Sequence, residues 1–431
     1  MEKFFRLKEH NTDVKTEILA GITTFMTMAY ILAVNPGILG STGMDASGVF
    51  TATALSAFVA TIIMALYAKY PFALAPGMGL NAFFATVVIG LGHSWQFALT
   101  AVLIEGIIFI ILGALKVREM IFNLIPVSLK KAVGVGIGLF ITFLGLTNAG
   151  IIVSGNGTIT SLGHITDSGV LLAIIGILIT AILHAKNVKG ALLIGIIATT
   201  LIGIPMGVTV IPENFSLFSL PPSIKNVAFQ FVGKDQILSF DMLVCIFTFL
   251  FVDIFDTVGT LAGVASKTGM LDEKGRLPRV GRALVSDAVG TVFGACMGTS
   301  TVTTFVESSA GVAEGGRTGL TSLTTAILFA LSLFIAPIFG IIPTQATAPA
   351  LILVGLFMLT PVTEINFKDP TEAIPAFFAI VMMPFAYSIA EGIVFGIISY
   401  TIIKTVSGRY KEVSPLMWVL SLLFVLRFIF L

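Results

Sequence analysis

Residues 249–264 read FLFVDIFDTVGTLAGV, and they place two acids, Asp253 and Asp256, in the middle of an apolar run from about 242 to 266. Two residues three positions apart on a helix lie on the same side, with about 4.5 Å of rise between them. A carboxylate inside a bilayer is costly and normally marks a pathway for a substrate, an ion or a proton. The alternative, two acids that reach a nearby interface, requires a helix end, which this run does not offer.

The composition predicts a polytopic membrane protein surrounded by a lipid bilayer. Of 431 residues, 56% are hydrophobic and 11% are charged, and apolar runs of spanning length recur along the chain. A net charge of +1 argues against nucleic acid as a partner. Cys245 and Cys296 lie in apolar runs and the four histidines are scattered, so we expect neither a metal site nor a cofactor. No catalytic motif is present, so we expect no enzyme.

The apolar runs predict fourteen transmembrane helices in two groups of seven. The first group lies near 16–35, 46–68, 72–91, 95–115, 129–150, 168–185 and 190–206. The second lies near 241–266, 280–298, 301–316, 319–340, 345–362, 371–387 and 388–406. The polar stretch 207–240 between them is predicted to be an extracytoplasmic loop. Residues 409–431 are predicted to be a cytoplasmic tail with an interfacial helix from 415.

The distribution of positive charge supports this topology. With the N-terminus in the cytoplasm, all of the 24 lysines and arginines except Lys225, Lys234 and Arg427 fall on the cytoplasmic side. Cytoplasmic loops carry an excess of Lys and Arg. We therefore expect both termini to be cytoplasmic.

An odd number of spans in each group gives the two halves opposite orientations, as in inverted-repeat transporters. The third span of each half is irregular: 71–81 reads PFALAPGMGLN, and 298–311 reads GTSTVTTFVESSAG. Proline, glycine and threonine runs favour an extended backbone, so each is predicted to be a short strand followed by a half-helix. Matched interruptions point to a substrate site. The alternative is a pair of kinked helices without function.

Five acids lie well inside the predicted spans: Glu105, Asp253, Asp256, Asp287 and Glu307. No lysine or arginine lies at comparable depth in the predicted spans, and an unpaired carboxylate in a low-dielectric site tends to hold a proton. Such groups suit proton-coupled binding of a neutral polar heterocycle.

Glu307 is the strongest candidate for a ligand contact, because it lies where the extended run would become a half-helix. Asn81 has a comparable place in the first half and offers both a donor and an acceptor; alternatively, it caps the broken helix. Asp287 and Glu105 are weaker candidates, which could simply bond across helices. Glu391 is expected at a span end.

Four stretches resemble the AzgA-type purine permeases, a branch of the nucleobase–ascorbate transporter superfamily that includes the bacterial uracil–proton symporter. They are 21–37 (GITTFMTMAYILAVNPG), 75–84 (APGMGLNAFF), 251–263 (FVDIFDTVGTLAG) and 298–319 (GTSTVTTFVESSAGVAEGGRTG). They lie in the first, third, eighth and tenth predicted spans, and the span count agrees along the whole chain.

The resemblance implies two inverted seven-span repeats that form a core domain (1–127 and 241–342) and a gate domain (128–206 and 343–408). It implies that Asn81, Asp253 and Glu307 contact a purine nucleobase, with the aromatic Phe305 beside it. It also implies that Asp256 takes part in proton coupling. The expected function is proton-coupled purine import across a bacterial cytoplasmic membrane, with a possible homodimer.

Three alternatives remain at this point. An anion carrier of the same architecture would be expected to present a basic or acid-free pocket, whereas three acids crowd this one. A cation channel could use Asp253, Asp256 and Glu307 as a filter, but broken third spans in inverted halves disfavour it. A membrane enzyme is the least supported, because no catalytic constellation is present.

Overall fold

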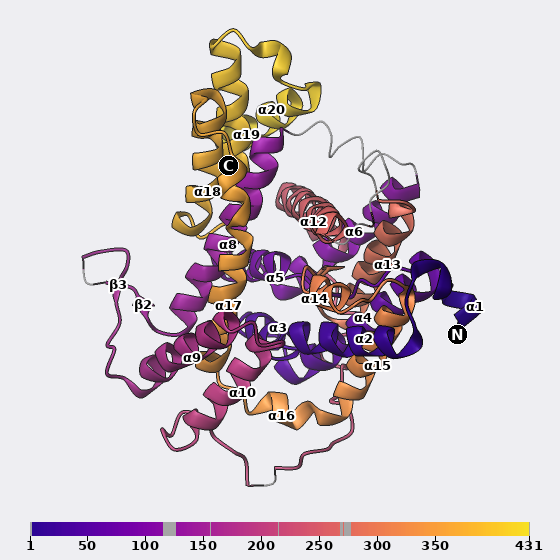
Figure 1. Ribbon diagram of the computed structural model, residues 1–431. Coiled ribbons are helices and arrows are strands. Elements are labelled where there is room, and N and C mark those ends of the chain that lie inside the picture. The colour runs from indigo at the N-terminus through magenta and orange to yellow at the C-terminus, as the bar shows by residue number, and fades with distance from the viewer. Residues whose placement is uncertain are drawn as a thin grey trace. The chain divides into compact units, whose positions relative to one another are not determined.

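The computed structural model describes residues 2–114, 126–155, 157–213, 215–267, 270 and 277–430 (Figure 1). The helices of the first half are α2 (Val14–Met28), α3 (Ile31–Gly40), α4 (Ala46–Ile63), α5 (Met78–Ala85), α6 (Trp95–Ala114), α8 (Val127–Asn148), α9 (Ser168–Ala185) and α10 (Ala191–Gly203). Those of the second half are α12 (Phe240–Lys267), α13 (Val280–Met297), α14 (Ser308–Ala313), α15 (Gly319–Ser332), α17 (Thr344–Met358), α18 (Pro370–Phe385), α19 (Ile389–Val406) and the terminal α20 (Pro415–Phe430). Within the described residues, nine helical segments are long and apolar enough to cross a membrane.

The chain forms two compact units. The first comprises Met1–Gly113 and Gly145–Leu351, and the second comprises Ala114–Leu144 and Ile352–Leu431. Every candidate ligand or proton-coupling residue falls in the first unit. The division into core and gate domains expected from the sequence remains a prediction.

The two irregular spans are broken as predicted, and they meet. Strand β1 (Leu74–Pro76) precedes α5, and strand β4 (Val302–Thr304) precedes α14. The strands pair antiparallel, with Leu74 opposite Thr304 and Pro76 opposite Val302. Prolines and β-branched residues keep both segments extended, and each strand supplies the backbone partners that an isolated strand inside a membrane would lack. One small sheet therefore joins the two halves of the sequence.

A threonine from the preceding helix supports each strand in the same way. The Thr61 hydroxyl of α4 donates to the Leu74 carbonyl (3.1 Å) and accepts from the Leu74 N–H (3.0 Å). The Thr291 hydroxyl of α13 donates to the Val302 carbonyl (3.1 Å) and accepts from the Val302 N–H (3.2 Å). Each hydroxyl thus satisfies the strand N–H and carbonyl groups that face away from the other strand. The two repeats therefore use equivalent threonines to make the same pair of hydrogen bonds.

Helices α14 and α15 of the second half lie against helices of the first, α14 on α2 and α15 on both α2 and α4 (Figure 1). A methyl group on Gly311 would lie 2.6 Å from the Ala20 carbonyl oxygen, and one on Gly21 would lie 2.5 Å from the Thr321 carbonyl oxygen. Such distances leave no room for a side chain. Glycine therefore permits the close packing of α2 with both helices.

A buried acid that the sequence did not single out, Glu17, binds the start of α15. Its carboxylate accepts hydrogen bonds from the backbone N–H groups of Arg317 (2.9 Å), Thr318 (3.3 Å) and Thr321 (3.1 Å), and from the Thr321 hydroxyl (2.6 Å). A carboxylate at a helix N-terminus satisfies N–H groups that have no partner within the helix. Glu17 thereby fastens α2 to α15.

The second unit holds a buried ion network of its own. Lys404, in the last turn of α19, is 1% exposed, and its Nζ lies 2.7 Å from Glu372 and 2.5 Å from Glu412. The sequence indicated only that Lys404 is basic and near the cytoplasm.

Glu391 lies in the first turn of α19, where the Ser388 hydroxyl caps the helix, so the expected position at a span end is confirmed.

Candidate functional site

Asp256 lies where α12 meets both broken spans. Its Oδ2 accepts a hydrogen bond from the Thr303 hydroxyl of β4 at 3.2 Å. A methyl group on Gly77, which links β1 to α5, would lie 3.2 Å from the same carboxylate oxygen and 2.7 Å from the Thr303 hydroxyl. Asp256 therefore accepts a hydrogen bond from the second half, and only the absence of a side chain at Gly77 separates it from the backbone of the first half.

Glu307 lies at the N-cap of α14, at the end of the extended run, as the sequence predicted. Its side chain is half-buried, and its Oε1 accepts a hydrogen bond from the Tyr30 hydroxyl at 2.7 Å. No capping bond joins the Glu307 carboxyl to the described N–H groups of α14. The carboxyl is therefore oriented by a tyrosine of the first span rather than by the half-helix that it precedes.

Asp253 and Asn81 are both fully buried. Asp253, one turn before Asp256 on α12, accepts a hydrogen bond from the Thr257 hydroxyl at 2.9 Å. Asn81, in the first turn of α5, donates to the Pro76 carbonyl at 3.3 Å. Its Oδ1 has no hydrogen-bond partner among the described residues. Asn81 thus supports the broken backbone, as one alternative predicted, and retains an acceptor for a ligand.

The remaining predicted residues surround β4. Phe305 is buried directly after the strand, and its N–H donates to the Ala73 carbonyl at 3.0 Å. The Thr301 hydroxyl donates to Glu105 of α6 at 3.5 Å, and the Thr304 hydroxyl donates to Asp287 of α13 at 3.0 Å. These two acids bond across to the broken span, which is the lesser role that the sequence suggested for them.

Three contributors were not recognised from the sequence: Tyr30, Gly77 and Thr303. Each lies in a stretch that resembles the purine permeases or has an irregular backbone, but its contacts are with residues far away in the chain. Tyr30 is 277 residues from Glu307, so nothing in its local sequence predicts their contact. The hydroxyl-rich run that contains Thr303 was the available signal, because a buried hydroxyl needs a hydrogen-bond partner.

These groups place several hydrogen-bond acceptors on α12 and on the two broken spans. The three carboxyl groups Asp253, Asp256 and Glu307 can accept N–H donors of a polar ligand when ionised, and can donate when protonated. Two of them, Asp256 and Glu307, are held by hydroxyl donors from other elements. The arrangement suits recognition of a ligand with an N–H-bearing polar edge, and it can exchange protons.

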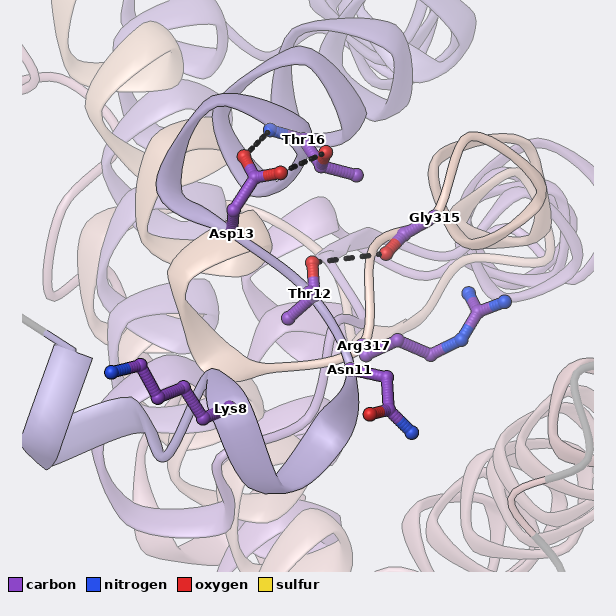
Figure 2. Close-up of a pocket in the computed structure, with 7 residues that line it drawn as sticks. All are labelled: Lys8, Asn11, Thr12, Asp13, Thr16, Gly315 and Arg317. Atoms are coloured by element: carbon purple, nitrogen blue, oxygen red, sulfur yellow. Dashed lines mark hydrogen bonds between the residues drawn. The ribbon is translucent and has the colours of Figure 1, made fainter.

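A separate hollow lies at the N-terminal segment and is lined by other residues (Figure 2). Here the Thr12 hydroxyl donates to the Gly315 carbonyl at 3.4 Å, and Asp13 caps α2 by accepting from the Thr16 N–H at 2.9 Å (Figure 2). These contacts anchor the start of α2 beside the turn that follows α14. None of the predicted site residues lines this hollow.

Comparison with known families identifies the class of protein. Residues 15–395 match the model of the permease family Xan_ur_permease. The chain belongs to this family. Membership makes it a permease rather than an enzyme, and its apolar helices make it a multi-pass membrane protein, as predicted.

Relatives of this permease are similar over nearly their full lengths. A putative permease of Methanocaldococcus jannaschii is 52% identical, over 100% of this chain and 98% of the relative. The adenine permease AdeP of Escherichia coli is 45% identical, over 100% and 96%. The guanine/hypoxanthine permease PbuG of Bacillus subtilis is also 45% identical, over 100% of both chains.

Solved structures confirm the fold of the permease. The transmembrane domain of the cyanobacterial bicarbonate transporter BicA superposes with a TM-score of 0.65 at 18% identity, over 89% of this chain and 97% of the other. SLC26A9 superposes with a TM-score of 0.66 at 12% identity, over 94% and 66%. At such low identity the likeness concerns the fold alone. It confirms an all-α polytopic protein of two inverted seven-span repeats with broken third and tenth spans.

Proposed function

We propose that this permease imports purine nucleobases together with protons. The observation that carries the proposal is the convergence of Asp256, Glu307 and Asn81 at the two paired broken spans, where an acceptor-rich site forms. Full-length relatives that are named as adenine and guanine/hypoxanthine permeases support purines as the substrate class.

The proposed roles follow from the chemistry of each side chain. Glu307 and Asp253 accept hydrogen bonds from N–H groups on the polar edge of the purine, and Asn81 adds an amide contact. Phe305 packs against the face of the ring. Asp256 takes up a proton on the outer side and releases it on the inner side, so that proton flow drives uptake.

Transport in this proposal follows alternating access. The core domain (1–127 and 241–342) carries the substrate and moves against the gate domain (128–206 and 343–408). The protein resides in the cytoplasmic membrane of a bacterium, with both termini in the cytoplasm, and the gate domains could pair in a homodimer.

Uptake into proteoliposomes tests the proposal. Radiolabelled hypoxanthine uptake is measured with and without an inward proton gradient, and competed with adenine, guanine, xanthine and uracil. We expect saturable, gradient-stimulated uptake that certain purines inhibit and uracil does not. Folded protein without saturable nucleobase uptake would refute purine transport. Saturable uptake that does not respond to the gradient would refute proton coupling alone.

A further inference from the structure

Tyr30 lies at a break in the first membrane-spanning segment. The apolar segment Val14–Gly40 is long enough to cross the membrane, but α2 ends at Met28 and α3 begins at Ile31. Tyr30, between them, is fully buried, and its hydroxyl donates to Glu307 Oε1 at 2.7 Å. A buried tyrosine of the first span thus bonds to the acid that the proposed function assigns to substrate contact.

The half-helix that begins at Glu307 packs tightly against the first span. A methyl group on Gly311 of α14 would lie 2.0 Å from the Thr24 hydroxyl of α2, so only glycine fits there. The Thr27 hydroxyl of α2 lies 3.5 Å from the Glu307 carbonyl oxygen. The first span therefore packs against the backbone around Glu307 and binds its side chain through Tyr30.

The direction of the hydrogen bond determines what Glu307 can present to a ligand. A tyrosine hydroxyl that donates to Oε1 makes that oxygen an acceptor, so a proton carried by Glu307 would have to lie on Oε2. A donated hydrogen bond also stabilises a carboxylate more than it stabilises the neutral acid. Tyr30 thus orients the carboxyl group and favours its role as an acceptor for ligand N–H groups.

We infer that Tyr30 is a positioning residue for nucleobase binding that acts through Glu307. This inference rests on the proposed function, because it requires Glu307 to contact the nucleobase. It goes beyond that function because it assigns to Tyr30 of the first span the role of making Glu307 a hydrogen-bond acceptor for the ligand.

A double-mutant cycle tests the inference. Binding of radiolabelled hypoxanthine, guanine and adenine to the purified full-length protein is measured by equilibrium dialysis for wild type, Tyr30→Phe, Glu307→Gln and the double variant. Without the Tyr30 hydroxyl the Glu307 carboxyl is no longer held in one orientation, so we expect Tyr30→Phe to weaken binding by about tenfold. In the Glu307→Gln background, the same change should alter affinity by less than about twofold, because its partner is already gone.

Tyr70→Phe is the matched control. Tyr70 is a buried tyrosine of the same unit whose ring stacks on Phe72 with centroids 5.2 Å apart. This variant should bind like wild type, and the melting temperature of each variant shows whether it is folded at the temperature of the binding assay. Equal weakening by Tyr30→Phe in both backgrounds would show a purely structural role and overturn the inference. Unchanged binding in Tyr30→Phe would do the same. Failure of wild type to bind any purine would instead refute the proposed function, and this inference with it.

Discussion

Asp256 bonds to the second broken span at Thr303 and lies next to Gly77 of the first, and the proposed function assigns proton transfer to it. Asparagine preserves the shape of the side chain and can still bond to the Thr303 hydroxyl, but it cannot take up a proton. We therefore expect Asp256→Asn to retain hypoxanthine binding and to lose uptake driven by a proton gradient. Dialysis binding and proteoliposome uptake of the same preparation measure the two properties. Unimpaired gradient-driven uptake would remove Asp256 from the coupling mechanism.

Gly77 provides a steric test of the same contact. A methyl group there would lie 2.7 Å from the Thr303 hydroxyl and 3.2 Å from Asp256, and overpacking of this kind typically costs about 1–3 kcal/mol. Gly77→Ala should separate Thr303 from Asp256 and impair hypoxanthine uptake driven by a proton gradient. Gly37→Ala is the control, since a methyl group at Gly37 meets no atom within 4 Å. Equal gradient-driven uptake in the two variants would show that the close approach of Gly77 is not needed.

At the scale of elements, Thr61 and Thr291, whose hydroxyls bind the backbone of β1 and β4, should contribute equally to stability. Valine at position 61 or 291 keeps the shape but leaves a strand N–H and carbonyl without their partner, which costs about 1–3 kcal/mol for each buried group. Thr61→Val and Thr291→Val should therefore lower the melting temperature in detergent to a similar extent. Thr180→Val is the control, because the Thr180 hydroxyl donates within its own helix, to the Gly176 carbonyl at 2.7 Å. A melting temperature that changes no more than in this control would argue against the supports.

The bond between Glu17 and α15 makes a second prediction at this scale. In Glu17→Gln one carboxylate oxygen becomes an NH₂ group, which cannot accept from the N–H groups of Thr318 or Thr321. The change should destabilise the protein by about 1–3 kcal/mol, seen as a lower melting temperature. Glu9→Gln, at an exposed position, should leave it unchanged. If both variants melt like wild type, Glu17 does not anchor α15.

At the scale of the whole molecule, the predicted topology can be tested by labelling. The two native cysteines, Cys245 and Cys296, are first replaced by alanine, and single cysteines are then introduced at the exposed positions Glu9, Leu220 and Lys411. An impermeant maleimide should label Leu220→Cys in right-side-out vesicles, and Glu9→Cys and Lys411→Cys only in inverted vesicles. Labelling of Glu9→Cys and Lys411→Cys from opposite sides would contradict an even number of spans.

The sequence predicted those parts of the structure that depend on local chemistry. Proline and threonine runs indicated both broken spans, which the structure shows as β1 and β4 followed by half-helices. The pairing of Leu74 with Thr304, the bond of Tyr30 to Glu307 and the binding of α15 by Glu17 were not predicted. Each joins residues more than 200 positions apart. A single sequence shows that a buried hydroxyl or carboxylate needs a partner, but it does not show which distant residue provides it.

The pairing of β1 with β4 also has a consequence for biosynthesis. Strand β1 is synthesised about 230 residues before its partner, and at ribosomal rates of about 5–20 residues per second this corresponds to roughly 10–50 s. During that interval Thr61 can already form its hydrogen bonds with Leu74, but the edge of β1 that pairs with β4 has no partner strand. An unpaired strand edge in a membrane is costly. We therefore expect the nascent first half to remain incompletely folded at this strand until the second half emerges, and a chain truncated before β4 to be left with an unpaired strand edge.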